Sequence, residues 1–214
     1  MTVGATDLML DEYVNVAHQQ LSAGRRWSPR QAEILDGLQK VFLEDGFRHL
    51  TIGDLVERLR CSRRTLYSIA PSKEELVLIV VDRLFNHMGK QAYAEASACE
   101  DAGDAVAAYL NRSITTFRPV RAAFTEDVEA YMPTKQLYDR HLQIALDVLG
   151  DLVTSGIEDG SFRQFHAQLI AEILDACVDR IRRPDVLARA GTTWSQAIAE
   201  FSELIRNGLL VGRA

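Results

Sequence analysis

The stretch from Thr51 to Leu76, which reads TIGDLVERLRCSRRTLYSIAPSKEEL, decides the fold of this chain. Thr51 and Ser62 are residues of the type that caps helices, and each stands directly before a short helical pattern of apolar residues. The first pattern ends near Arg60, and Pro71 terminates the second. Two short helices joined by a turn of about three residues are typical of a helix-turn-helix motif.

A further helix is expected on each side of this motif. Before it, Ser28-Pro29-Arg30-Gln31 combines an N-cap, a proline at the first helical position and a capping-box glutamine, and Gly46 marks the end of the helix. After it, Ser72-Lys73-Glu74-Glu75 is a second capping box. This box opens a helix that is expected over about 73–98.

The remaining sequence predicts long amphipathic helices. Only five prolines interrupt the 214 residues, and each stands near an expected helix end. The fold class is therefore predicted to be all-α with about nine helices. The later ones are expected over about 104–117, 121–132, 134–159, 169–181 and 194–209. Residues 1–27 are predicted to be an N-terminal arm or extra helix, residues 28–75 a helix-turn-helix domain, and residues 76–214 a second helical domain.

The composition is that of a globular chain, with 47% hydrophobic and 25% charged residues. No run reaches 18 consecutive apolar residues, so no transmembrane helix is expected. No Lys or Arg precedes Arg25, so a secretory signal is not expected either. Cys61, Cys99 and Cys177 are odd in number and lack zinc-type spacing. We interpret them as reduced thiols of a cytoplasmic protein, and we expect no metal and no cofactor.

The charge is unevenly distributed along the chain. The net charge is −6, yet residues 58–73 carry five basic side chains and no acidic one. A basic cluster on an acidic chain suggests a phosphate-binding face. An ordinary solvated helix end would explain the same cluster.

Enzymatic motifs are missing from the sequence. It contains no HExxH, GxSxG, P-loop or dinucleotide-binding fingerprint, and its five histidines form no close pair. We therefore predict that the protein is not an enzyme and that it has no catalytic residue. For a non-enzyme with a helix-turn-helix motif, the alternative to a DNA-binding protein is a helical protein-interaction or structural module that has lost sequence-specific DNA binding.

Three motifs in order resemble the TetR family of transcriptional regulators. They are Asp45-Gly46-Phe47 followed by Thr51-Ile52-Gly53-Asp54-Leu55, then Ser62-Arg63-Arg64-Thr65-Leu66-Tyr67, and finally Pro71-Ser72-Lys73-Glu74-Glu75-Leu76. The family usually has a glycine in the turn where this chain has Arg60. The resemblance implies a three-helix DNA-binding head in residues 28–75. It also implies a helical domain for effector binding and dimerisation in residues 76–214.

The DNA-binding residues are expected at and around the second helix of the motif. Arg63 and Arg64 stand at its N-terminus, where a side chain can fork onto guanine O6 and N7 or contact a phosphate. Lys73 matches the phosphate-contacting lysine of the family, and Thr51 suits either a cap alone or a cap that also contacts phosphate. The full expected set is Thr51, Ser62, Arg63, Arg64, Thr65, Tyr67, Ser68 and Lys73.

The resemblance also implies a small-molecule pocket and a homodimer. Ordinary core packing would explain the same apolar residues. The candidate pocket residues are Met88, Tyr109, Phe117, Phe124, Tyr131, Tyr138, His141 and Cys177. The candidate dimer residues are Ile170, Leu174, Trp194, Ile198, Phe201 and Ile205. The expected function is a homodimeric repressor that reads a pseudo-palindromic DNA operator in the major groove and is released by a small hydrophobic effector, with no membrane partner.

Overall fold

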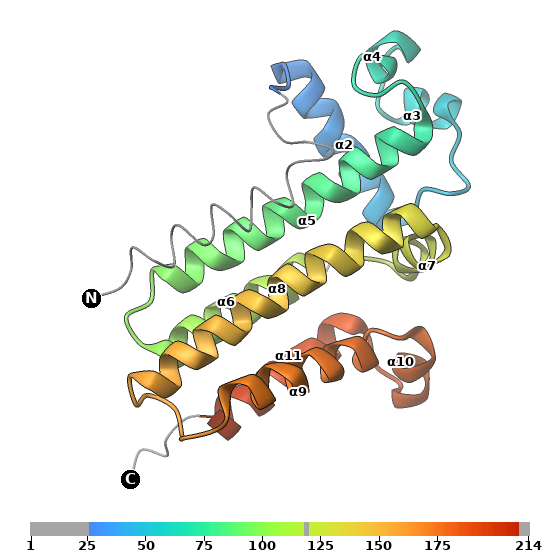
Figure 1. The fold of residues 1–214 in the computed structure, drawn as a ribbon. Coiled ribbons are helices and arrows are strands. Elements are labelled where there is room, and N and C mark those ends of the chain that lie inside the picture. The colour runs from blue at the N-terminus through green and yellow to red at the C-terminus, as the bar shows by residue number, and fades with distance from the viewer. Residues whose placement is uncertain (1–25, 118–119, 210–214) are drawn as a thin grey trace. The chain divides into compact units, whose positions relative to one another are not determined.

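A computed structural model describes residues 26–117 and 120–209, and within these residues the chain forms ten α-helices (Figure 1). The all-α fold class is thereby confirmed. The N-terminal arm or extra helix expected in residues 1–27 lies almost wholly outside the described residues, so it stays a prediction. None of the described helices is long and apolar enough to cross a membrane.

The chain divides into two compact units. Unit 1 consists of Met1–His87 and Pro119–His141, and unit 2 consists of Met88–Arg118 and Leu142–Ala214. Two of the three boundaries fall inside long helices, α5 (Lys73–Ser97) and α8 (Met132–Glu158), so each of these helices contributes to both units. The division expected from the sequence, 28–75 and 76–214, concerns function and stays a prediction.

Unit 1 contains the helix-turn-helix motif. Its described helices are α2 (Pro29–Asp45), α3 (Ile52–Arg58), α4 (Arg63–Tyr67), the beginning of α5, α7 (Ala122–Ala130) and the beginning of α8. Local signals define α2: the Ser28 hydroxyl accepts from the Gln31 N–H, and the Gln31 side chain accepts from the Ser28 N–H. Gly46, at φ +77°, ends the helix by donating to the Phe42 carbonyl.

The core of unit 1 joins α7 to the loop after α2. Phe47 is only 2% exposed, and its ring centroid lies 5.7 Å from that of Phe42 and 6.1 Å from that of Phe124 on α7. The Asp127 carboxylate on α7 accepts from the Phe47 N–H at 2.6 Å and from the Arg48 N–H at 2.8 Å. The backbone must also come close here, because a Cβ on Gly46 would lie 2.5 Å from Asp127 Oδ2.

The boundary between α7 and α8 differs from the sequence expectation. We expected helices over 121–132 and 134–159 that are separated by Pro133, but α8 already begins at Met132. Pro133 therefore occupies the first turn of α8, where a backbone N–H has no partner within the helix and its absence costs nothing. Buried Thr134 secures this start by donating its hydroxyl to the Tyr131 carbonyl at 2.8 Å.

Unit 2 consists of the end of α5, α6 (Ala102–Phe117), most of α8, α9 (Ala167–Ile181), α10 (Pro184–Ala190) and α11 (Trp194–Leu209). Helix α11 packs along α6 and also contacts α9, beside which it lies in Figure 1. The short helix α10 was not expected from the sequence. Pro184 was interpreted as the end of a helix, whereas it is the first residue of α10, which ends at Gly191 in the left-handed conformation (φ +64°).

Candidate nucleic-acid interface

Helix α4 is a five-residue helix whose two ends are set by hydrogen bonds. At its start the Ser62 hydroxyl accepts from the Thr65 N–H at 3.1 Å, as expected for an N-cap. Its inner side carries Leu66, which is 1% exposed and anchors the helix in the core of unit 1. Its outer side carries Arg63, Arg64 and Tyr67, all exposed, and Tyr67 retains 49% of its accessible surface.

The three small hydroxyl residues expected at the interface make bonds within α4 and its caps. The hydroxyls of Ser62 and Thr65 lie 2.9 Å apart and share a hydrogen bond. The Ser68 hydroxyl donates to the Thr65 carbonyl at 2.7 Å. These bonds account for the shape of the helix, and contacts of these hydroxyls with DNA stay a prediction.

Thr51 caps α3 in a reciprocal capping box. Its hydroxyl accepts from the Asp54 N–H at 3.2 Å, while Asp54 Oδ2 accepts from the Thr51 N–H and from the Thr51 hydroxyl, each at 2.7 Å. These hydrogen bonds hold the pKa of the Asp54 carboxyl below its ordinary value. The bond from the Thr51 N–H has the larger effect, and the bond from the Thr51 hydroxyl has the next largest. The structure therefore gives Thr51 a capping role, and a phosphate contact stays a prediction.

Lys73 is the first residue of α5, and its side chain is half-buried. Its ammonium donates to the Arg48 carbonyl at 2.9 Å, which connects the beginning of α5 to the loop between α2 and α3. The Ser72 hydroxyl accepts from the Glu75 N–H at 3.1 Å, which is the cap expected there. An ammonium at this helix start can hold an anion together with the free backbone N–H groups of the first turn.

The turn between α3 and α4 contains the only positive φ of a non-glycine residue among the described residues. Arg60 lies at φ +48°, in the left-handed region that favours glycine. Its N–H donates to the Glu57 carbonyl, and the Cys61 N–H donates to the Val56 carbonyl, each at 3.2 Å. This pair of bonds is a Schellman motif, which requires a left-handed residue after the helix.

We expect the Arg60→Gly variant to be more stable than Arg60→Ala by about 1 kcal/mol, because a side chain in the left-handed region is strained and glycine is not. Both variants remove the same charge, so their difference isolates the backbone strain. Denaturant unfolding of the two proteins measures this difference. Equal unfolding free energies would show that the turn stores no strain.

The candidate pocket residues divide between the two units. Unit 1 contains Phe124, Tyr131, Tyr138 and His141, and unit 2 contains Met88, Tyr109, Phe117 and Cys177. Their assembly into one pocket stays a prediction. Tyr109 is buried and its hydroxyl donates to the Ala145 carbonyl at 3.1 Å. Burial is the main cause that raises the pKa of this phenol.

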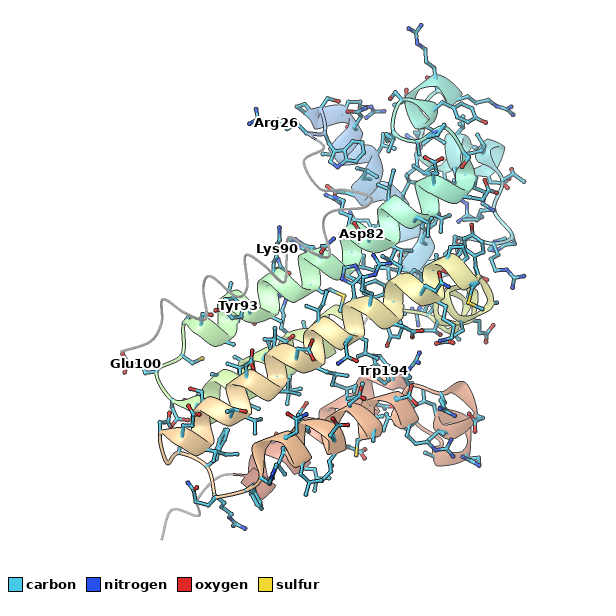
Figure 2. All side chains as sticks on the ribbon, viewed as in Figure 1. Arg26, Asp82, Lys90, Tyr93, Glu100 and Trp194 are labelled. Atoms are coloured by element: carbon cyan, nitrogen blue, oxygen red, sulfur yellow. The ribbon has the colours of Figure 1, made fainter. Side chains whose placement is uncertain are left out.

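A buried carboxylate in unit 1 was missed by the sequence analysis. Asp82 on α5, labelled in Figure 2, is 1% exposed, and its Oδ1 lies 3.0 Å from Nε2 of His141. The Phe85 ring contacts both His141 and Tyr138, with centroids 5.6 Å and 5.3 Å away. The available signal was a single acidic residue that follows the apolar run LVLIVV. Such a residue is rarely buried without a partner.

Most of the candidate dimer residues are buried within their own chain. Leu174, Ile198, Phe201 and Ile205 are each at most 8% exposed, whereas Ile170 and Trp194 are half-buried. Other apolar residues of the same helices are exposed instead. They are Leu169 (56%) and Ile173 (47%) on α9 and Leu204 (70%) on α11.

The family model described as bacterial regulatory proteins, tetR family, matches residues 34–80, which cover α3, α4 and much of α2. Residues 34–80 of this chain therefore resemble the TetR family. An uncharacterized HTH-type transcriptional regulator of Mycobacterium tuberculosis is 40% identical over 52 residues, which are 24% of this chain and 26% of the relative. The alignment thus spans about a quarter of the curated relatives that the chain matches.

Solved structures resemble this chain over most of its length. A putative transcriptional regulator from Saccharomonospora viridis, crystallised in complex with choline, has a TM-score of 0.70 at 18% identity and covers 87% of this chain and 100% of its own. A TetR-family regulator from Agrobacterium tumefaciens has a TM-score of 0.66 at 15% identity and covers 85% of this chain and 98% of its own. At this identity the similarity establishes the fold.

Proposed function

We propose that this chain binds double-stranded DNA through unit 1 and regulates transcription. The observation that carries the proposal is the outer side of α4, where Arg63, Arg64 and Tyr67 are exposed. On the opposite, inner side of this helix, buried Leu66 anchors it in the core of unit 1. A helix of this kind fits the major groove, and its first residues face the base edges. The absence of acidic residues from 58–73 removes repulsion between this face and DNA phosphates.

The residues proposed to bind DNA have different roles. Arg63 and Arg64 begin the recognition helix and reach bases or the adjacent phosphates. Tyr67, Lys73 and Thr51 bind phosphates and so fix the position of the helix on the duplex. The hydroxyls of Ser62, Thr65 and Ser68 maintain the helix through their bonds within it, and their remaining hydrogen-bonding capacity is available to DNA.

We further propose that the regulator is a homodimer. Exposed Leu169 and Ile173 on α9 and exposed Leu204 on α11 support this, because apolar side chains on adjacent helices favour association with a second copy. A dimer of helix-turn-helix heads places its recognition helices about 34–36 Å apart and therefore requires a pseudo-palindromic site. The exposed residues replace most of our candidate dimer set in this proposal.

Regulation by a small molecule completes the proposal. The Saccharomonospora viridis structure was solved with choline, which supports a ligand of small-molecule size in this fold. The interior of unit 1 offers aromatic rings beside a buried polar pair, Asp82 and His141. An effector that binds better to a conformation unable to engage the operator would release DNA by shifting the population.

Binding to DNA across a salt series tests the proposed function. The purified protein is titrated with the duplex upstream of its own gene and with a scrambled duplex of equal length. Specific binding that weakens steeply with salt and leaves a two-fold footprint supports a dimeric operator-binding regulator. Equal and weak binding to both duplexes, repeated with genomic fragments, favours the helical interaction module instead.

We expect Lys73→Ala to weaken binding to all DNA sequences alike and to lower the salt slope by about one, because a phosphate contact carries no sequence information. The matched control is Lys40→Ala, which removes an exposed lysine from α2. The unfolding transition of the variant shows whether loss of the bond to the Arg48 carbonyl has changed the fold. A loss confined to certain base pairs would contradict the phosphate role.

A further inference from the structure

Gln31 connects two helices that are far apart in sequence. Its Oε1 accepts from the Ser28 N–H at 2.9 Å, which completes the capping box of α2. Its Nε2 donates to the Ser68 carbonyl at 3.1 Å and to the Ser68 hydroxyl at 3.4 Å. One side chain therefore joins the beginning of α2 to the C-cap of the recognition helix α4.

Helix α4 needs such external support. It has five residues, which is less than two turns, and helices of this length are unstable on their own. Ser62 secures its N-terminus and Leu66 its inner side. At the C-terminus the Leu66 carbonyl accepts from the Ile69 and Ala70 N–H groups. The Gln31 amide donates to the next exposed carbonyl, that of the C-cap Ser68, and so supplies a bond from outside the motif.

We propose that Gln31 is a positioning residue for operator recognition, which fixes the C-terminal end of α4 so that Arg63, Arg64 and Tyr67 meet the DNA at a defined angle. The inference rests on the proposed DNA-binding function. Forked arginine contacts are directional, so a recognition helix that rocks about Leu66 loses base contacts while its phosphate contacts tolerate the movement.

The two ends of the Gln31 side chain can be tested separately. Gln31→Glu keeps the acceptor for the Ser28 N–H and removes the donor to Ser68. Gln31→Met removes both without adding charge. Ser28→Ala removes the hydroxyl cap of α2 and leaves the connection to Ser68 in place. Comparison of the three variants separates a role in capping α2 from a role in positioning α4.

The first measurement is operator binding by the full chain against a scrambled duplex. We expect Gln31→Met to lower affinity for the operator about three- to tenfold, as for the loss of one or two hydrogen bonds, and to leave scrambled-duplex affinity and the salt slope unchanged. We expect Gln31→Glu to lower both affinities, because it also adds a negative charge beside the phosphates. Ser28→Ala should bind as the unchanged protein does.

The second measurement is amide hydrogen exchange across residues 63–70 without DNA. We expect faster exchange there in Gln31→Met and Gln31→Glu, but not in Ser28→Ala. Equal loss of operator affinity in Ser28→Ala and Gln31→Met would show a capping role and overturn the proposal. Unchanged operator affinity in Gln31→Met would overturn it as well. Absence of specific binding by the unchanged protein would instead overturn the proposed function, and this role with it.

Discussion

The Arg63→Ala/Arg64→Ala double variant is expected to lose operator binding by a factor between roughly thirty and twenty thousand. Each forked contact to guanine contributes about 1–3 kcal/mol of discrimination, and the two side chains stand at the start of the recognition helix. Both are exposed, so their removal should change the free energy of unfolding by no more than about 0.5 kcal/mol. Fluorescence anisotropy with a labelled operator measures the loss.

A charge-matched control accompanies this experiment. Arg163→Ala/Arg189→Ala removes two exposed arginines from unit 2 and should bind the operator as the unchanged protein does. The single variants at Arg63 and Arg64 then separate the two contact types. A base contact relaxes preference at one base pair, whereas a phosphate contact lowers the salt slope by about one. A double variant that binds as tightly as its control would refute the role of α4.

The Phe47→Ala variant should have the largest effect on stability, a loss of about 3–5 kcal/mol in the free energy of unfolding of unit 1. Its ring is 2% exposed between Phe42 and Phe124, and alanine leaves a cavity where the loop after α2 meets α7. The backbone bond from residue 47 to Asp127 survives the substitution, so the loss measures the packing of the ring.

The two tryptophans make this measurement specific to unit 1. Trp27 belongs to unit 1 and Trp194, labelled in Figure 2, to unit 2. In a Trp194→Phe background, denaturant unfolding followed by fluorescence therefore reports on unit 1. The control is Phe165→Ala on unit 2, which removes a ring that is 41% exposed and should leave the transition of Trp27 unchanged. Equal shifts in both variants would contradict the assignment of the core.

The sequence predicted those parts of the fold that local chemistry determines. The caps Ser28, Thr51 and Ser62 were all found where expected, because a cap depends on a residue and the backbone two or three positions later. Helix α10 was missed because Pro184 is compatible with both the end of one helix and the beginning of another. The start of α8 at Met132 was missed for the same reason.

Contacts between distant residues could not be predicted from one sequence. Asp127 lies 80 positions from Phe47, and Gln31 lies 37 positions from Ser68, so no spacing rule connects them. Apolar periodicity likewise marks a buried stripe without saying what buries it. For this reason Ile198 and Ile205 were candidates for the dimer interface, although α6 and α9 of the same chain pack against their helix.

The strained turn at Arg60 also affects how this protein would respond to selection. Replacement by glycine relieves the backbone but removes one of the five positive charges between residues 58 and 73. A screen for heat resistance would therefore enrich glycine at this position, and a screen for tight DNA binding at low ionic strength would retain arginine. Because stability and electrostatic attraction are coupled in one side chain, thermostable descendants of this protein should bind DNA more weakly.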